Sequence, residues 1–197
     1  MSLRKRYRYW GATATEIERV MPGDGAIPDA TYDTTLAVTI DAPAADIWPW
    51  LVQMGYRRGG LYSYDWLDRL FGFLDAPSAE RVLPEHQRLA VGDVIPIGRG
   101  DGFPVAAVDP QRSMVLGGET GDGFHWVWQF GLYPLDERRT RLVSRSRARL
   151  PRTLRSTLFM GALEPAAFIM TRRMLLGLKR RAERLATARR EAKARAA

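Results

Sequence analysis

The sequence contains no cysteine among its 197 residues and only two histidines. Without cysteine the chain has no disulfide, no thiolate metal ligand and no cysteine nucleophile, and we expect a cytoplasmic protein. His86 in "PEHQR" and His125 in "GFHWVW" show no metal-ligand spacing, whereas a zinc site needs three or four protein ligands. The sequence therefore predicts no metal site and no bound cofactor.

Long apolar runs and recognisable catalytic motifs are absent as well. No stretch of about 18 apolar residues predicts a membrane-spanning helix, and "MSLRKRYRYW" does not have the pattern of a secretory signal. The glycine-rich stretches "GRGDG" and "GGETGDG" lack the lysine of a phosphate-binding loop, and we predict hairpin turns there. Ser63 is not part of a nucleophile-elbow sequence. These absences exclude the common signatures of nucleotide-binding and hydrolytic enzymes.

Positive charge is present in excess but is concentrated at one end of the chain. The net charge is +8, and residues 172–197 contain ten Lys or Arg and two Glu. The other 171 residues are therefore neutral overall, with no basic face of the kind that binds nucleic acid. We expect no nucleic-acid partner. The basic end is either a solvated helix end or a peripheral contact with an anionic membrane surface.

The length and the hydrophobic content of 46% suit one well-buried core. We expect an N-terminal extension over residues 1–33, a single domain over 34–188 and a basic Ala/Arg-rich tail over 189–197. In the extension, Thr13 and Glu16 have the spacing of a capping box, which predicts a helix over residues 14–20.

The first part of the domain predicts one strand followed by two helices. "TTLAVTI" (34–40) is rich in β-branched residues and predicts a strand. A helix should follow from Pro43 to Gly55, with an apolar stripe that faces the core. In "GGLYSYDWLDRLFG" (59–72), Ser63 is a candidate N-cap. We expect the apolar side chains of that second helix to face the interior, with Asp65 and Asp68 turned toward water.

The middle of the chain predicts short antiparallel strands. "DVIPI", "FPVAAVD" and "SMVLGGE" are separated by turn sequences. In "GDGFHWVWQFGLYPL" the alternation is strict, so that Phe124, Trp126, Trp128 and Phe130 share one face, and we expect the other face to be mixed and wettable. In "TRLVSRSRARL", Ser144 and Ser146 share a face of small residues, while Arg145 lies on the other face. Small side chains beside an aromatic row leave space that a closed core would fill.

The C-terminal part predicts one long helix from Pro165 to about Ala188. Proline disfavours helical geometry in the preceding residue, so we expect a break at Glu164. Met170 and Met174 lie on the same face of this helix, where methionine suits adaptable apolar contacts.

This order of elements, together with "TIDAPAADIWPWLVQMG", "GGLYSYDWLDRLFG" and "LEPAAFIMTRRMLLGLKRRAE", resembles the SRPBCC superfamily. That group contains START-like lipid-binding domains, polyketide cyclases and pollen-allergen-like proteins, and "VGDVIPI" and "WPWLVQMG" look like one bacterial branch of it. The resemblance covers about residues 34–185. It implies an α+β helix-grip fold, in which a curved antiparallel β-sheet wraps a long C-terminal α-helix and encloses a hydrophobic cavity. The superfamily has no universal catalytic motif, so the resemblance identifies no catalytic residue.

Within that fold, the aromatic row would face the cavity, the two serines would leave volume, and the methionines would form the opposite wall. Such a lining is mostly apolar, with a few polar groups to orient a ligand. The predicted ligand-binding residues are Tyr62, Tyr64, Trp66, Phe124, Trp126, Trp128, Phe130, Ser144, Ser146, Met170 and Met174.

Two functions fit these residues. The first is a carrier or sensor for an apolar small molecule such as a lipid, an isoprenoid or a polyketide. The second is an enzyme of the polyketide cyclase or aromatase type, in which the cavity positions a reactive chain and one side chain transfers a proton. The candidates for proton transfer are Tyr62, Tyr64, Asp65 and Arg145, although strand alternation places Arg145 outside the cavity. Because no acid–base pair can be identified, we favour the carrier.

Overall fold

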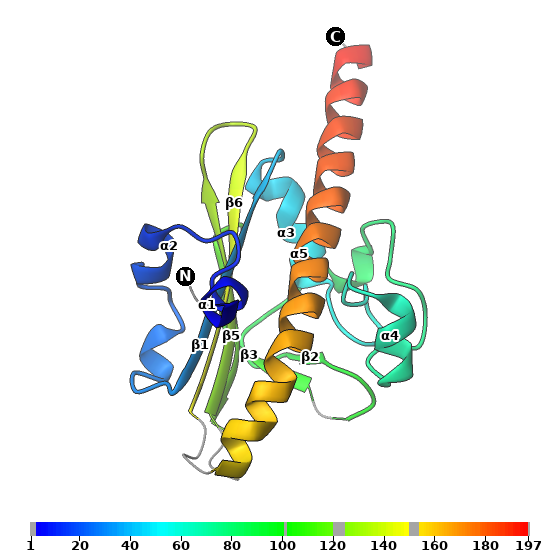
Figure 1. The fold of residues 1–197 in the computed structure, drawn as a ribbon. Helices are drawn as coiled ribbons and strands as arrows, with labels where there is room; N and C mark the ends of the chain where they lie inside the picture. Colours follow the sequence, from blue (N-terminus) through cyan, green and yellow to red (C-terminus); the bar gives the residue numbers. More distant parts are fainter. Residues whose placement is uncertain (1–2, 101, 120–124, 150–153, 197) are drawn as a thin grey trace.

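The computed structural model describes residues 3–100, 102–119, 125–149 and 154–196 (Figure 1). Its centre is a six-stranded antiparallel sheet with the strand order β1-β6-β5-β4-β3-β2. The strands are β1 (Tyr32–Ile40), β2 (Val94–Pro96), β3 (Gly102–Asp109), β4 (Ser113–Glu119), β5 (His125–Pro134) and β6 (Thr140–Arg149). The helices are α1 (Leu3–Arg8), α2 (Ala14–Glu18), α3 (Ala44–Val52), α4 (Asp65–Leu70) and α5 (Leu154–Ala196), with 3₁₀ turns η1 (Asp24–Ala26) and η2 (Pro84–His86).

The chain order explains how the sheet and the long helix are arranged. After β1 the chain leaves the sheet for α3 and α4, and it returns through β2 to β6 as consecutive antiparallel neighbours. β6 then pairs with β1, from Tyr32 opposite Ala148 to Ile40 opposite Thr140. α5 crosses one face of this sheet, with α3 beside it (Figure 1). The arrangement is the α+β helix-grip fold that the resemblance implied.

The main core lies between the inner face of the sheet and the middle of α5. Full burial of one large apolar side chain stabilises the folded state by roughly 1.5–3 kcal/mol. The predicted stripe of α3 is confirmed, because Ile47, Trp50 and Leu51 are all buried in this core despite Pro49 inside the helix. The sheet and α5 contribute Leu36, Ile40, Met114, Leu116, Phe130, Leu132, Leu142, Met174, Leu175, Leu178 and Ala182.

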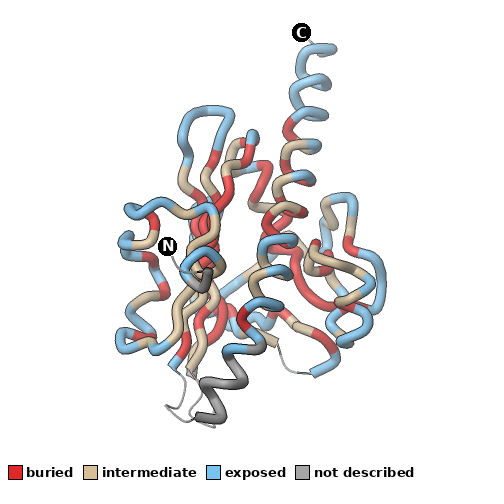
Figure 2. The backbone as a smooth tube through the Cα atoms, in the orientation of Figure 1, coloured by how far each residue is buried: buried red, intermediate tan, exposed pale blue. Residues whose placement is uncertain are grey.

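The expected break before Pro165 is wrong, since α5 runs without interruption from Leu154 to Ala196. A proline inside a helix removes one backbone hydrogen bond and bends the helix rather than always ending it. Glu164 is buried, and its carboxylate accepts a hydrogen bond of 2.5 Å from Nε of Arg8 in α1. The helix also continues through the predicted tail, whose last turns are exposed and extend beyond the rest of the molecule (Figure 2).

The N-terminal extension is divided between two places: α1 lies beside α5, whereas the segment with α2 and η1 covers the outer face of the sheet, opposite α5 (Figure 1). The predicted capping box is present, because Thr13 accepts from the Glu16 backbone N–H and the Glu16 carboxylate accepts from the Thr13 N–H. We expected the outer face of β5 to be wettable, and this is wrong. Val127 packs against Ile27 of the extension, and both side chains are almost fully buried.

Two polar side chains on the outer face fix the extension to the sheet. Arg145 lies on this face, as strand alternation predicted, and is only 3% exposed. Its guanidinium donates to the Asp24 carboxylate (2.6 Å), to Thr35 Oγ1 (3.0 Å) and to three backbone carbonyls of residues 16–19. Gln129 is fully buried, accepts from the Gly23 N–H (2.9 Å) and donates to Asp24 (2.7 Å). Arg145 of β6 and Gln129 of β5 therefore hold the segment with α2 and η1 against the sheet.

Candidate functional site

Four aromatic rings form a continuous cluster on the inner face of the sheet. We call Phe103 of β3 together with Trp126, Trp128 and Phe130 of β5 the aromatic cluster. The two indoles lie parallel, with centroids 6.3 Å apart and an angle of 7° between their planes. Phe103 meets Trp126 edge-on at 4.4 Å, and Phe130 lies 4.9 Å from Trp128. These separations and orientations are the favourable ones for aromatic pairs. Phe103 is not among the predicted ligand-binding residues, because the strand "FPVAAVD" has no aromatic alternation.

Small residues stand opposite this row in the neighbouring strand, as the sequence predicted. Trp128 is paired with Ser146, and Phe130 with Ser144. The Trp128 Nε1–H donates to Ser144 Oγ at 3.0 Å, so the polar atom of this indole is satisfied within the protein. On the other side Gly118 of β4 stands opposite Trp126 and has no side chain. Trp128 and Phe130 stand opposite Leu116 and Met114 of β4, so side-chain volume beside the row is small along β6 and, on the β4 side, only at Trp126.

Burial changes along the row. Phe130 is fully buried, whereas Trp126, Trp128 and Phe103 are half-buried. The facing helix shows the same change, because Met174 is buried in the core and Met170, one turn earlier, is half-buried. The Phe130 end of the space between sheet and helix is therefore filled by protein. At the Trp126 end, the aromatic side chains retain exposed surface.

Tyr62 is packed and hydrogen-bonded inside the protein, so its ring and hydroxyl are not open to a ligand. It is buried, its hydroxyl donates to the carbonyl of Trp50 at 3.1 Å, and burial raises its pKa above the ordinary value. The Arg181 guanidinium lies 4.7 Å from its ring centroid. Gly177 of α5 explains how closely the helix approaches, since a Cβ there would lie 2.2 Å from the Tyr62 carbonyl oxygen. Tyr62 thus joins its loop to α3 and α5.

The other predicted rim residues lie around α4. Tyr64 is half-buried, with the Arg173 guanidinium 5.4 Å from its ring centroid. Trp66 is on the outward side of α4 and is largely exposed. Phe124 falls outside the described residues.

The expected orientation of α4 is wrong, because its acidic side chains face inward. Asp68 is fully buried, and its Oδ2 accepts a hydrogen bond of 2.6 Å from Ser63 Oγ. Asp65 accepts from both the backbone N–H (3.0 Å) and the hydroxyl (2.6 Å) of Ser78. Ser63 therefore does not cap the helix, whose N-cap position is occupied by Tyr64. These hydrogen bonds to nearby serines outweigh the apolar stripe in setting the orientation.

Asp68, which the sequence predicted to face water, is instead a buried titratable residue. Its Oδ1 is buried and has no hydrogen-bond partner among the described residues. Burial, and secondarily the charge of Asp65, raises the pKa of the Asp68 carboxyl, although the Ser63 hydrogen bond opposes this. Ser63 lies only five residues before Asp68, but the apolar stripe of the same segment predicted the opposite orientation, and Ser78, which binds Asp65, is 13 residues beyond Asp65.

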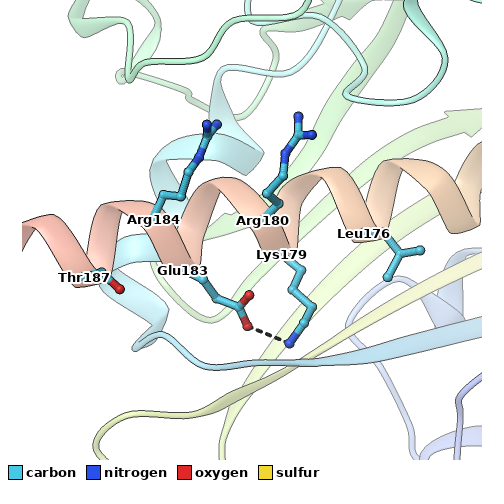
Figure 3. A pocket seen from close by; sticks show the side chains of 6 residues that line it. All are labelled: Leu176, Lys179, Arg180, Glu183, Arg184 and Thr187. Atoms are coloured by element: carbon cyan, nitrogen blue, oxygen red, sulfur yellow. Dashed lines mark hydrogen bonds and ion pairs between the residues drawn. The ribbon is translucent and has the colours of Figure 1, made fainter.

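Two hollows on the surface are lined mostly by charged residues, which do not suit an apolar ligand. One, of about 390 Å³, lies along α5 and is lined by Leu176, Lys179, Arg180, Glu183, Arg184 and Thr187 (Figure 3). Lys179 there is already bound to Glu183 (2.6 Å) and to the carbonyl of Thr39 (2.8 Å). The other, of about 700 Å³, is lined by Asp41, Asp136, Glu137, Arg138, Arg139 and Arg190.

The described residues carry neither a cluster of metal ligands nor a helix suited to span a membrane. Within residues 3–100, 102–119, 125–149 and 154–196, no three His, Asp or Glu side chains are grouped so that they could hold a metal ion. Over the same ranges, none of the helices has the length and apolar character to cross a bilayer.

Comparison with solved structures finds similar folds. A protein from Thermobifida fusca matches with a TM-score of 0.48 at 14% identity, over 78% of this chain and 94% of that one. The Zhui aromatase/cyclase from a Streptomyces species matches with a TM-score of 0.40 at 19% identity, over 78% and 94%. The Aha1 dimer from Colwellia psychrerythraea gives 0.41 at 16% identity, over 73% and 94%. No protein-family model and no curated protein sequence matches the chain.

Proposed function

We propose that the protein binds a hydrophobic small molecule, such as a lipid, an isoprenoid or a polyketide, against the aromatic cluster and acts as its carrier or sensor. The observation that carries this proposal is that Trp126, Trp128 and Phe103 are only half-buried, although much of the rest of the sheet is covered by other parts of the protein. The outer face is covered by the N-terminal extension, and the Phe130 end is filled. Stacked rings that keep exposed surface beside small residues are typical of an apolar binding site.

The ligand would contact only part of the predicted lining. Trp126, Trp128, Ser146 and Met170 are half-buried and would form the contact surface together with Phe103. The more deeply buried members of the prediction would support this surface from behind; they are Tyr62, Phe130, Ser144 and Met174. Because the Trp128 N–H is already bound by Ser144, shape and apolar contact would select the ligand more than hydrogen bonding does.

The alternative function, a cyclase or aromatase, is favoured by one observation, the raised pKa of the buried Asp68 carboxyl. Carboxyl groups with raised pKa values are suited to proton transfer. The other candidates are engaged elsewhere: the Tyr62 hydroxyl with Trp50, Asp65 with Ser78, and Arg145 with the N-terminal extension. Asp68 itself is hydrogen-bonded to Ser63 rather than to a member of the aromatic cluster. The carrier therefore remains the better supported function.

The proposal is tested by titrating the protein with an apolar fluorescent probe, N-phenyl-1-naphthylamine. Trp128→Ala should weaken probe binding about tenfold, because one aromatic contact contributes roughly 0.5–1.5 kcal/mol beyond its buried area. Ser146→Leu should also weaken it, by filling the space opposite Trp128. Phe71→Ala, at an exposed ring on the end of α4, is the matched control and should bind as the wild type does. Equal affinities for the wild type, Trp128→Ala and Ser146→Leu would rule out the aromatic cluster as the binding surface.

A further inference from the structure

The outward side of α4 and of the turn after it is strongly apolar. Trp66 is 67% exposed, Leu70 71%, Phe71 61% and Phe73 38%. We call these four residues the α4 patch. Trp66 and Leu70 are one helical turn apart on the same side of the helix, and the rings of Phe71 and Phe73 lie 6.1 Å from each other. Isolated exposed apolar residues are common, but a contiguous group of this kind marks an interaction surface.

The orientation of α4 is fixed by specific contacts. With the apolar side buried instead, Asp65 and Asp68 would face water at little cost. In the structure both carboxylates are turned inward, onto the hydroxyls of Ser63 and Ser78. The backbone N–H of Phe73 also donates to the Asp68 carbonyl at 2.7 Å, which holds the turn after the helix. Four hydrogen bonds, including that of the Ser78 N–H to Asp65, thus hold α4 with the α4 patch turned outward.

The size of the α4 patch argues against a second copy of the chain as its partner. A large aromatic side chain presents about 200 Å², so the exposed fractions leave on the order of 400 Å² of apolar surface over the four residues. A stable protein–protein interface buries about 800 Å² on each partner. A lipid surface imposes no such minimum, because each side chain inserts individually between headgroups.

Charge around the α4 patch favours an anionic surface. Arg69 is exposed within the helix, and the exposed Arg99 follows Gly98, whose backbone lies against Gly72 and Phe73. The exposed Arg57 pairs with Asp75, an acidic side chain close to Phe73 in the chain. Because both aspartates of α4 point inward, the charge of the helix exterior is that of Arg69. Tryptophan, phenylalanine and leucine beside arginine are the side chains that enrich the boundary of a membrane.

We propose that the α4 patch docks the protein on the surface of an anionic lipid bilayer, with Trp66, Leu70 and Phe71 inserted and Arg69 and Arg99 at the headgroups. This inference does not depend on what the aromatic cluster binds, and it concerns a different surface from the basic end of α5. It predicts binding that persists in part at high salt, because the inserted side chains contribute an apolar component that salt does not screen.

The test is sedimentation of the full chain with vesicles of mixed phosphatidylcholine and phosphatidylglycerol. The double variant Trp66→Ser/Leu70→Ser should partition at least tenfold less than the wild type, and Arg69→Gln should reduce binding at low salt only. Val20→Ser removes an even more exposed apolar side chain, which follows α2 and lies outside the α4 patch, and should change nothing. Brominated lipids should quench the tryptophan fluorescence of the wild type more than that of Trp66→Phe. Circular dichroism of each variant verifies that the fold is retained.

Three results would overturn the proposal. They are absence of wild-type binding to these vesicles, equal binding by the double variant, and a concentration-dependent dimer that the double variant abolishes. Titration of the same variants with N-phenyl-1-naphthylamine in the absence of vesicles measures ligand binding alone, so failure of the docking proposal can be told from failure of the proposed function. If the double variant loses vesicle binding but keeps its affinity for the probe, the substitutions act on the α4 patch and leave the aromatic cluster unchanged.

Discussion

Replacing Arg145 with methionine should detach the N-terminal extension from the sheet. Arg145 reaches from β6 to the segment that contains α2 and η1, and it has almost no exposed surface. Five hydrogen bonds of 2.6–3.0 Å leave its guanidinium, one to the Asp24 carboxylate, one to Thr35 Oγ1 and three to backbone carbonyls of residues 16–19. Methionine keeps an apolar side chain of similar length but supplies none of these donors.

The expected cost follows from the groups that the substitution leaves unpaired. Breaking a buried ion pair by removing one partner costs about 3–5 kcal/mol, because the other charge stays buried. Asp24 retains some compensation, since Gln129 donates to it at 2.7 Å and Arg147 lies at 3.5 Å. We therefore expect Arg145→Met to lower the free energy of unfolding by about 3–4 kcal/mol, toward the lower end of that range. Arg145→Lys has three donors instead of five and should lose about half as much.

Urea denaturation followed by circular dichroism measures this loss, and limited trypsin digestion reports cleavage within residues 13–30. The extension should be cut faster in Arg145→Met than in the wild type. Arg138→Met, on the exposed β5–β6 hairpin, is the control and should stay within about 0.5 kcal/mol of the wild type. If the free energy of unfolding of Arg145→Met lies within about 1 kcal/mol of the wild-type value, the hydrogen bonds of Arg145 are not what holds the extension on the sheet.

Two more predictions concern Asp68 and the end of α5. Because burial raises the pKa of Asp68 in the folded state, its proton stabilises the fold fully below the ordinary value of 3.8, and this contribution is lost as the pH rises through the raised pKa. Asp68→Asn should therefore gain thermal stability relative to the wild type between pH 4 and pH 7, whereas a difference independent of pH would contradict the raised pKa. Removing residues 190–197 should keep the fold and lower the salt-sensitive adsorption to anionic vesicles, and unchanged adsorption would eliminate the basic end as a membrane contact. A truncation that also removes Arg189 should be less stable, since Arg189 pairs with the buried carboxylate of Asp46.

Strand alternation was enough to predict the inner face of the sheet. The period of two placed Trp126, Trp128 and Phe130 on one side and Arg145 on the other, and the register of β5 and β6 brought Ser144 and Ser146 opposite the rings. Such local patterns predict structure well when both neighbours in the sheet come from adjacent segments of the chain.

The errors have a common physical origin in contacts between distant segments. α4 is turned by Ser78, which lies outside the helix and its flanking residues, so its apolar stripe gave the wrong side. The outer face of β5 is covered by residues more than 100 positions earlier, through Gly23 and Asp24. Pro165 stays inside α5, whose preceding residue Glu164 is held by Arg8 from the start of the chain. Periodicity within one segment carries no information about these partners.

The central claim, that an apolar small molecule binds at the aromatic cluster, is tested most directly by native mass spectrometry of the purified full chain. We predict a population heavier than the polypeptide by the mass of one small apolar molecule. Extraction with organic solvent should release this molecule, and purified Trp128→Ala should carry less of it than the wild type. A spectrum that shows only the mass of the polypeptide, before and after incubation with lipid, isoprenoid and polyketide mixtures, would contradict the claim.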